Sequence, residues 1–173
     1  ILVLDGVEGV QPQTYMVNNQ MSRYGVPKIV FVNKCDRDEA SVDLITEQLY
    51  NKLGLKSAFV SIPVPSQNGS GLEGVIDLVG MQYLVFSGNH GENIQSQPIP
   101  ERLLSRAVEL RETLIGELSS IIQSEELLEA YSSDRLETDM LNSAIRRATI
   151  SYGFVPIFSG SALKSIGIQP VLE

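Results

Sequence analysis

The chain has 173 residues, of which 43% are hydrophobic and 20% are charged. This is enough apolar material for one good-sized core and a smaller attached lobe. Acidic residues outnumber basic ones, 21 to 13, which argues against a protein that binds nucleic acid by electrostatics alone. No apolar run reaches the roughly 18 residues of a membrane span, and one cysteine excludes an internal disulfide. We expect a globular chain that is monomeric and has no membrane partner.

The first third of the chain predicts alternating strands and helices. The strands are short apolar runs, and the helices repeat apolar residues every three or four positions, with Pro12 at a helix start and Gly25 and Gly54 at helix ends. The expected elements are a strand at 1–4, a helix at 12–24, a strand at 28–32, a helix at 41–53 and a strand at 57–64. A strand, a helix and a strand within about 32 residues form a βαβ unit, which indicates a parallel sheet.

The regular alternation ends after residue 64. Two strands, at 74–79 and 82–86, predict a small meander that turns at the glycine-rich segment 88–91. Helices are expected at 101–121, 124–131 and 138–150, the last two with Ser124 and Thr138 as N-caps, and a buried strand at 155–158. We therefore expect an α/β fold in which residues 56–148 form an α+β insertion, within a βαβ-type domain made of residues 1–55 and 149–173.

Both ends of the sequence fall within expected elements. It starts with the apolar run Ile1–Leu4, without an initiator Met, and stops at residues 170–173, which resemble the first turn of a helix. Natural termini seldom lie inside elements. The sequence therefore predicts an internal fragment, and we expect such a fragment to be marginally stable or to aggregate.

A polar segment, Asn33-Lys34-Cys35-Asp36, follows the strand at 28–32. Ligands of open α/β sheets bind at the carboxyl ends of the strands. A carboxylate at Asp36 can accept both the N1–H and the N2 amine of guanine, whereas adenine offers no such donor pair. Asn33 has a donor and an acceptor for another edge of the base or a neighbouring loop, and the stem of Lys34 can cover the base face. The alternative is an ordinary Asn-Lys-x-Asp turn that ends a strand.

A second small-residue segment, Gly160-Ser161-Ala162-Leu163-Lys164, follows the strand at 155–158. Small residues allow the backbone to approach a base, and the Ala162 N–H can donate to guanine O6. Taken alone, this segment is better explained as a turn before a helix. Together with the Asn33–Asp36 segment, at the end of another buried strand, it indicates a guanine site.

These residues resemble the GTPase domain of elongation factor G, and the resemblance runs nearly end to end. Its landmarks are Asp5 to Gln13, Phe31 to Arg37 and Gly160 to Lys164, and the segments that fit the G-prime insertion of that domain are 61–63, 74–78 and 145–149. Residues 160–163 and 167–170 look closest to the mitochondrial form. Cys35 departs from the pattern, because Met or Leu is usual at that position.

The resemblance implies a P-loop-NTPase-type parallel sheet, of which this chain holds the C-terminal half, with the G-prime insertion at 56–148. It implies that Asn33, Lys34 and Asp36 bind the guanine of GTP or GDP, with Ser161, Ala162 and Leu163 on its other side. The family hydrolyses GTP on the ribosome, contacting rRNA and the stalk protein, and drives translocation of tRNA and mRNA. The implied location is the mitochondrial matrix, or alternatively the cytoplasm of a bacterium.

The sequence holds no G-x-x-x-x-G-K-[ST] segment, so we assign no catalytic residue and no metal ligand within it. In the full-length protein, the resemblance implies, Mg²⁺ and the catalytic groups are held outside this chain. We expect the chain alone to hydrolyse no GTP and to bind it poorly. Two alternatives remain: a ribosome-recycling or peptide-release GTPase, and a non-catalytic α/β interaction module.

Overall fold

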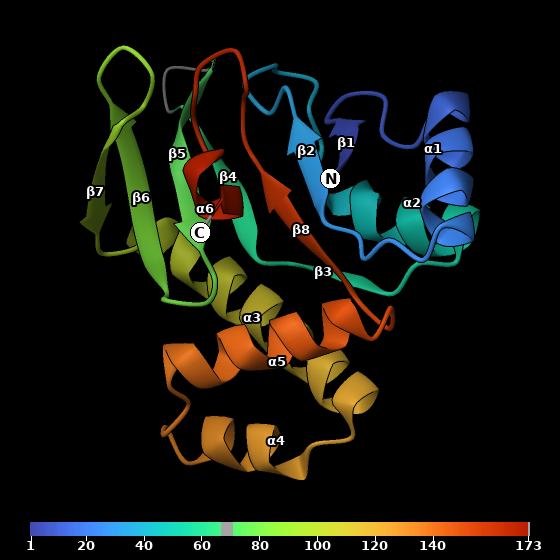
Figure 1. Cartoon of the computed structure of the whole chain (residues 1–173). Coiled ribbons are helices and arrows are strands. Elements are labelled where there is room, and N and C mark those ends of the chain that lie inside the picture. Colours follow the sequence, from blue (N-terminus) through green and yellow to red (C-terminus); the bar gives the residue numbers. More distant parts are fainter. Residues whose placement is uncertain (67–70, 173) are drawn as a thin grey trace.

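The structure is a computed structural model, and it describes residues 1–66 and 71–172 (Figure 1). One of its two sheets is parallel, with the strand order β1-β2-β8-β3. Its strands are β1 (Leu2–Asp5), β2 (Val30–Asn33), β8 (Val155–Ser159) and β3 (Ser57–Phe59), and two helices of the βαβ part are α1 (Pro12–Arg23) and α2 (Asp43–Leu53). All four strands run in the same direction, so their carboxyl ends lie at one edge of the sheet.

The other sheet is antiparallel, with the order β4-β5-β6-β7. Its strands are β4 (Ser61–Pro65), β5 (Leu72–Asp77), β6 (Gln82–Ser87) and β7 (Asn93–Gln97). The remaining helices are α3 (Glu101–Ile122), α4 (Glu125–Ser132), α5 (Thr138–Ile150) and α6 (Gln169–Leu172). Figure 1 shows α3, α4 and α5 grouped below the two sheets, and α6 beside the antiparallel one.

Alternation along the parallel strands places buried side chains on both faces of that sheet. On one face Leu4 and Val32 join Ile45 and Leu49 of α2 in a cluster that continues into the antiparallel sheet and α3. On the other face Ala58 belongs to a second cluster, with Leu114 of α3 and Leu141 of α5. The two clusters fix the sheet between its helices, and with it the loops at the carboxyl ends of the strands.

The predicted α/β class with a parallel sheet and an antiparallel meander is confirmed. The single strand predicted at 57–64 is wrong, because it breaks at Val60. The Val60 N–H donates to Ile157 O at 2.8 Å in the parallel sheet, and Val60 O accepts the Leu78 N–H at 2.9 Å beside the other sheet. The chain thus crosses from one sheet to the other at this residue.

The N-cap predicted at Thr138 is also wrong. Glu137 has the extended backbone of an N-cap, and its carbonyl accepts the Leu141 N–H at 3.2 Å, so Glu137 caps the helix, whose bounds of 138–150 are as predicted. Ser124 does precede α4 with extended backbone, but no side-chain capping bond forms there.

The division into a partial GTPase domain and an insertion stays a prediction. The strand β3, which the prediction assigned to the insertion, pairs with β8 of the parallel sheet. Within the described residues, no helix is both long and apolar enough to cross a membrane.

Candidate functional site

The two segments predicted to bind guanine follow neighbouring strands, β2 and β8, at the same edge of the parallel sheet. Their backbones are joined directly. The Cys35 N–H donates to Gly160 O at 3.0 Å, and the Gly160 N–H donates to Val32 O at 3.0 Å. The loop after β2 and the loop after β8 are therefore held side by side, as the sequence predicted for a common site.

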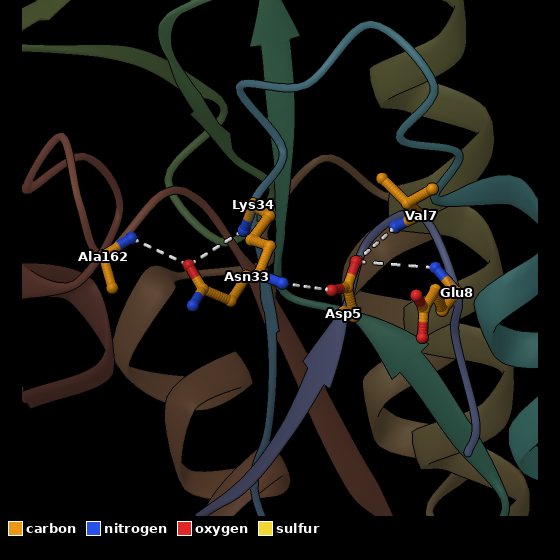
Figure 2. Close-up of polar contacts among 6 residues, drawn as sticks. All are labelled: Asp5, Val7, Glu8, Asn33, Lys34 and Ala162. Carbon is orange, nitrogen blue, oxygen red and sulfur yellow. Dashed lines mark hydrogen bonds and ion pairs between the residues drawn. The ribbon is translucent and has the colours of Figure 1, made fainter.

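Asn33 joins these loops through its side chain (Figure 2). Its Oδ1 accepts the N–H of Lys34 at 2.8 Å and the N–H of Ala162 at 2.9 Å. The expected Ala162 donation to guanine O6 is therefore replaced in this structure by donation to Asn33. The two bonds fix the carboxamide of Asn33 through its oxygen, and the Nδ2 amine is the remaining donor of this side chain.

Lys34 turns the chain at the end of β2. Its φ of +63° lies in the left-handed region that side-chain-bearing residues seldom adopt, which is typical of functional loops. Its Nζ donates to Asp5 Oδ2 at 2.5 Å, and Figure 2 shows the side chain reaching from β2 to β1. The ion pair is partly screened, because the Lys34 side chain is 44% exposed and that of Asp5 14%.

Asp5 was not predicted as a site residue. It ends β1, and its Oδ1 accepts the Val7 N–H at 2.9 Å and the Glu8 N–H at 3.4 Å. The hydrogen bond from Lys34 holds the pKa of Asp5 below its usual value of 3.8. Asp5 begins the first landmark of the resemblance, Asp5 to Gln13, but the sequence analysis assigns no binding role to it.

Cys35 lies beneath the site, with 5% of its surface exposed. Its Sγ donates to Val32 O at 3.3 Å, and burial raises the pKa of its thiol to about 12. The thiol is therefore neutral at physiological pH, and Cys35 is a packing residue.

Asp36 is half-buried at the start of the loop after Cys35. Across residues 1–66 and 71–172, its carboxylate has no hydrogen-bond or ion-pair partner. The neighbouring carboxylate, Asp5, is by contrast engaged on both oxygens. Asp36 is thus an acceptor at this edge that remains available to a ligand.

The loop after β8 is a closed turn. The N–H and carbonyl of Ser161 bond to the carbonyl and N–H of Ile166, at 2.9 and 3.1 Å. Ser161 is buried, whereas Ala162 and Leu163 are exposed, Leu163 to 87%. A Cβ at Gly160 would lie 2.1 Å from Ile166 O, so only glycine fits there. The turn therefore presents backbone and the Leu163 side chain outward; it holds Ser161 inward.

The family model of the elongation factor Tu GTP-binding domain matches residues 1–173. Over its full length the chain is 42% identical to "Elongation factor G 1" of Desulfotalea psychrophila, of which it covers 25%, and 40% identical to "Elongation factor G 1" of Treponema pallidum, of which it covers 24%. A protein of the same description from Syntrophus aciditrophicus is 38% identical, with 24% of it covered. The chain thus spans about a quarter of the length of these relatives.

The fold also matches a crystal structure of a protein from Thermus thermophilus, with a TM-score of 0.78 and 22% identity over 98% of this chain and 24% of that one. This likeness supports the architecture. The match to the family model covers every residue, and the joined loops after β2 and β8 lie within it. The chain belongs to the elongation factor Tu GTP-binding domain family, and its homologues include bacterial elongation factors G.

Proposed function

We propose that this chain supplies the base-binding half of a guanine-nucleotide site. Asp36 accepts the N1–H and N2 amine of guanine, Asn33 Nδ2 donates to the other edge of the base, and the Lys34 stem covers one base face. Residues Ser161, Ala162 and Leu163 close the opposite side. The observation that carries the proposal is the carboxylate of Asp36, which has no partner within the described part of the chain and lies in a loop that bonds to the loop after β8.

The chemistry of the two carboxylates at this edge supports the assignment. Asp5 is neutralised by Lys34, so that Asp36 is the carboxylate left to form a charge-assisted, bidentate pair. Burying a carboxylate against a base that lacks donors leaves it unpaired, and this penalty rejects adenine. Selectivity for guanine then comes from the Asp36 side chain, which follows the residue whose N–H bonds to Gly160 O.

The full-length protein carrying Asp36→Asn tests this function. The amide presents a donor toward position 2 of the base, where xanthine has a carbonyl. We expect GDP affinity to fall about a hundredfold and the preference to move toward XDP. The matched control is Asp38→Asn, the same change at an exposed residue two positions along the chain. Unchanged GDP preference in Asp36→Asn would sink the proposal.

For the whole protein we propose the role of an elongation factor G: hydrolysis of GTP on the ribosome, coupled to translocation of tRNA and mRNA. Its partners would be rRNA and the stalk protein, and its Mg²⁺ would be held by residues outside this chain. The 38–42% identity to proteins of that description supports this role over the recycling and release alternatives. Inactivity of the chain by itself stays a prediction, as does the monomeric state.

The cellular location follows from the organism of origin. Residues 160–163 and 167–170 resemble the mitochondrial form, whereas the relatives named above are bacterial. The mitochondrial location therefore stays a prediction, with the bacterial cytoplasm as its alternative. Co-fractionation of a tagged full-length protein with mitochondrial ribosomes would establish the mitochondrial location.

A further inference from the structure

The turn between β6 and β7, residues 88–92, lies against the start of α6. Residues 160–168, the loop after β8 that leads into α6, are called the base loop below. The amide Nε2 of Gln169, at the start of α6, donates to Gly91 O at 2.8 Å and lies 3.3 Å from His90 O. It also lies 3.2 Å from Ser165 O, in its own segment. One amine thus joins carbonyls of two segments that are 78 residues apart along the chain.

Gly91 makes the close approach of the two segments feasible. It is buried, its φ is +64°, and a Cβ at this position would lie 2.2 Å from Ser165 O and 2.9 Å from Gln169 Nε2. Its turn is shaped locally by Glu92, whose carboxylate accepts the His90 N–H at 2.7 Å. Any larger residue at 91 would push the turn away from the base loop.

The contact is one bond away from the proposed guanine site. The Ser165 N–H donates to Ala162 O at 3.2 Å, and the Ala162 N–H donates to Asn33 Oδ1 at 2.9 Å. A hydrogen-bonded path therefore runs from the β6–β7 turn through Gln169, Ser165 and Ala162 to Asn33. Behind it, a Cβ at Gly167 would lie 3.0 Å from Val75 of β5, so the base loop packs on the antiparallel sheet.

We infer that Gln169 is a positioning residue for guanine-nucleotide binding, which holds the base loop against the β6–β7 turn and so slows nucleotide release. The inference rests on the proposed function. With the Gln169 contact in place, the base loop is held in its binding conformation before the nucleotide arrives. It therefore loses less conformational entropy on binding than it would without this contact. Displacement of the β6–β7 turn would therefore loosen residues 161–163 and accelerate release.

The test measures dissociation of fluorescently labelled GDP from the full-length protein by stopped flow. Gln169→Met keeps the length and the apolar stem of the side chain but removes its donors, and we expect release to accelerate roughly tenfold. Gln169→Lys retains donors for the same carbonyls and should release at a rate close to wild type. This rescue distinguishes hydrogen bonding to the turn from simple packing.

A variant on the other side of the contact tests the coupling. Gly91→Ala lies in the β6–β7 turn, and it should also accelerate release. Because both changes break one contact, the double variant Gln169→Met/Gly91→Ala should be no faster than the faster single one. The matched control is Gln95→Met on β7, where the side chain is exposed, and it should leave release unchanged.

The outcomes separate this inference from the proposed function. If Asp36→Asn loses its guanine preference while Gln169→Met releases GDP at the wild-type rate, the inference is overturned and the proposed function stands. If Asp36→Asn retains the preference, the guanine site itself is wrong and the inference falls with it. Should Gly91→Ala fail to fold, the Gln169→Met and Gln169→Lys pair still decides.

Discussion

Asn33 and Ala162 lie 129 residues apart in the sequence, and a single hydrogen bond of 2.9 Å joins them at the carboxyl edge of the parallel sheet. The acceptor is a side-chain oxygen and the donor is a backbone N–H, so the bond depends on the identity of residue 33 but not on that of residue 162. Under the proposed function Asn33 therefore has two roles: its oxygen ties the loops together, and its amine donates to the base.

Two substitutions separate these roles. Asn33→Asp keeps an acceptor for the N–H groups of Lys34 and Ala162, so the loops should stay joined, but it removes the donor toward the base. We expect thermal stability close to wild type and GDP affinity lowered about tenfold or more. Isothermal titration and a thermal melt on the same full-length preparation measure both quantities.

Asn33→Ala removes the acceptor as well. Lys34 and Ala162 then lose a partner for their N–H groups, and we expect an additional loss of about 1 kcal/mol in the free energy of unfolding. Exposure of Ala162 to water limits the loss. Equal stability of the Asp and Ala variants would contradict the tie between the loops.

The ion pair of Asp5 with Lys34 predicts a pH dependence. The Lys34 hydrogen bond lowers the pKa of Asp5 below 3.8 in the folded state. The stability that this pair contributes is therefore fully present above pH 3.8. It is lost as the pH falls through the lower folded-state pKa. The Asp5→Asn variant keeps an acceptor for the Val7 N–H but has no charge, so its deficit relative to wild type should shrink in acid.

The deficit at pH 7 should be below about 1 kcal/mol, since the Lys34 side chain is 44% exposed and solvent screens the pair. Urea unfolding of both proteins at dilute concentration, at pH 7 and again below pH 3.8, measures the two differences. Asp38→Asn, at an exposed position, is the control. A deficit that grows in acid would reverse the assigned sign and refute the pairing.

Cys35 should be unreactive in the folded protein. Its pKa is raised to about 12, so little of the thiol is in the reactive thiolate form. Its side chain is also buried, with 5% exposed, so a reagent cannot readily reach the sulfur. Alkylation by iodoacetamide at neutral pH, followed by mass spectrometry of the Cys35 peptide, should proceed at least about a hundredfold more slowly in the folded than in the unfolded state. Similar rates in the two states would show that the loop after β2 opens freely.

Local patterns were sufficient for the features that depend on nearby residues. The apolar run before Asn33 predicted β2, and the polar segment after it predicted a binding loop. The missed strand β7 has the sequence Asn-Ile-Gln-Ser-Gln, and all its residues are exposed, so no hydrophobic alternation marks it. It forms because β6 offers a free edge, which a single segment does not reveal.

Long-range pairings explain the other differences. The crossing at Val60 depends on bonds to Ile157 and Leu78, and the engagement of Asp5 depends on Lys34, 29 residues away. No spacing rule predicts which of two nearby carboxylates a lysine will bind. The sequence therefore identified Asp36 as a base-binding candidate but could not show that Asp5 would be neutralised beside it.

The strand β1 predicts how the 173-residue chain behaves in isolation. Among the residues that the structure describes, β1 pairs with β2 alone, and Ile1 and Val3 are 62% and 58% exposed, so an apolar strand edge faces solvent. Such an edge is a template for pairing with another copy. We expect the chain to self-associate as its concentration rises, and Val3→Lys to reduce this, because a charge on an edge strand opposes pairing.

Light scattering after gel filtration, over a concentration series, measures the effect. Tyr24→Lys is the matched control, since Tyr24 is 76% exposed but follows α1, outside the sheet. If both substitutions reduce association equally, general apolar exposure and not the β1 edge is responsible.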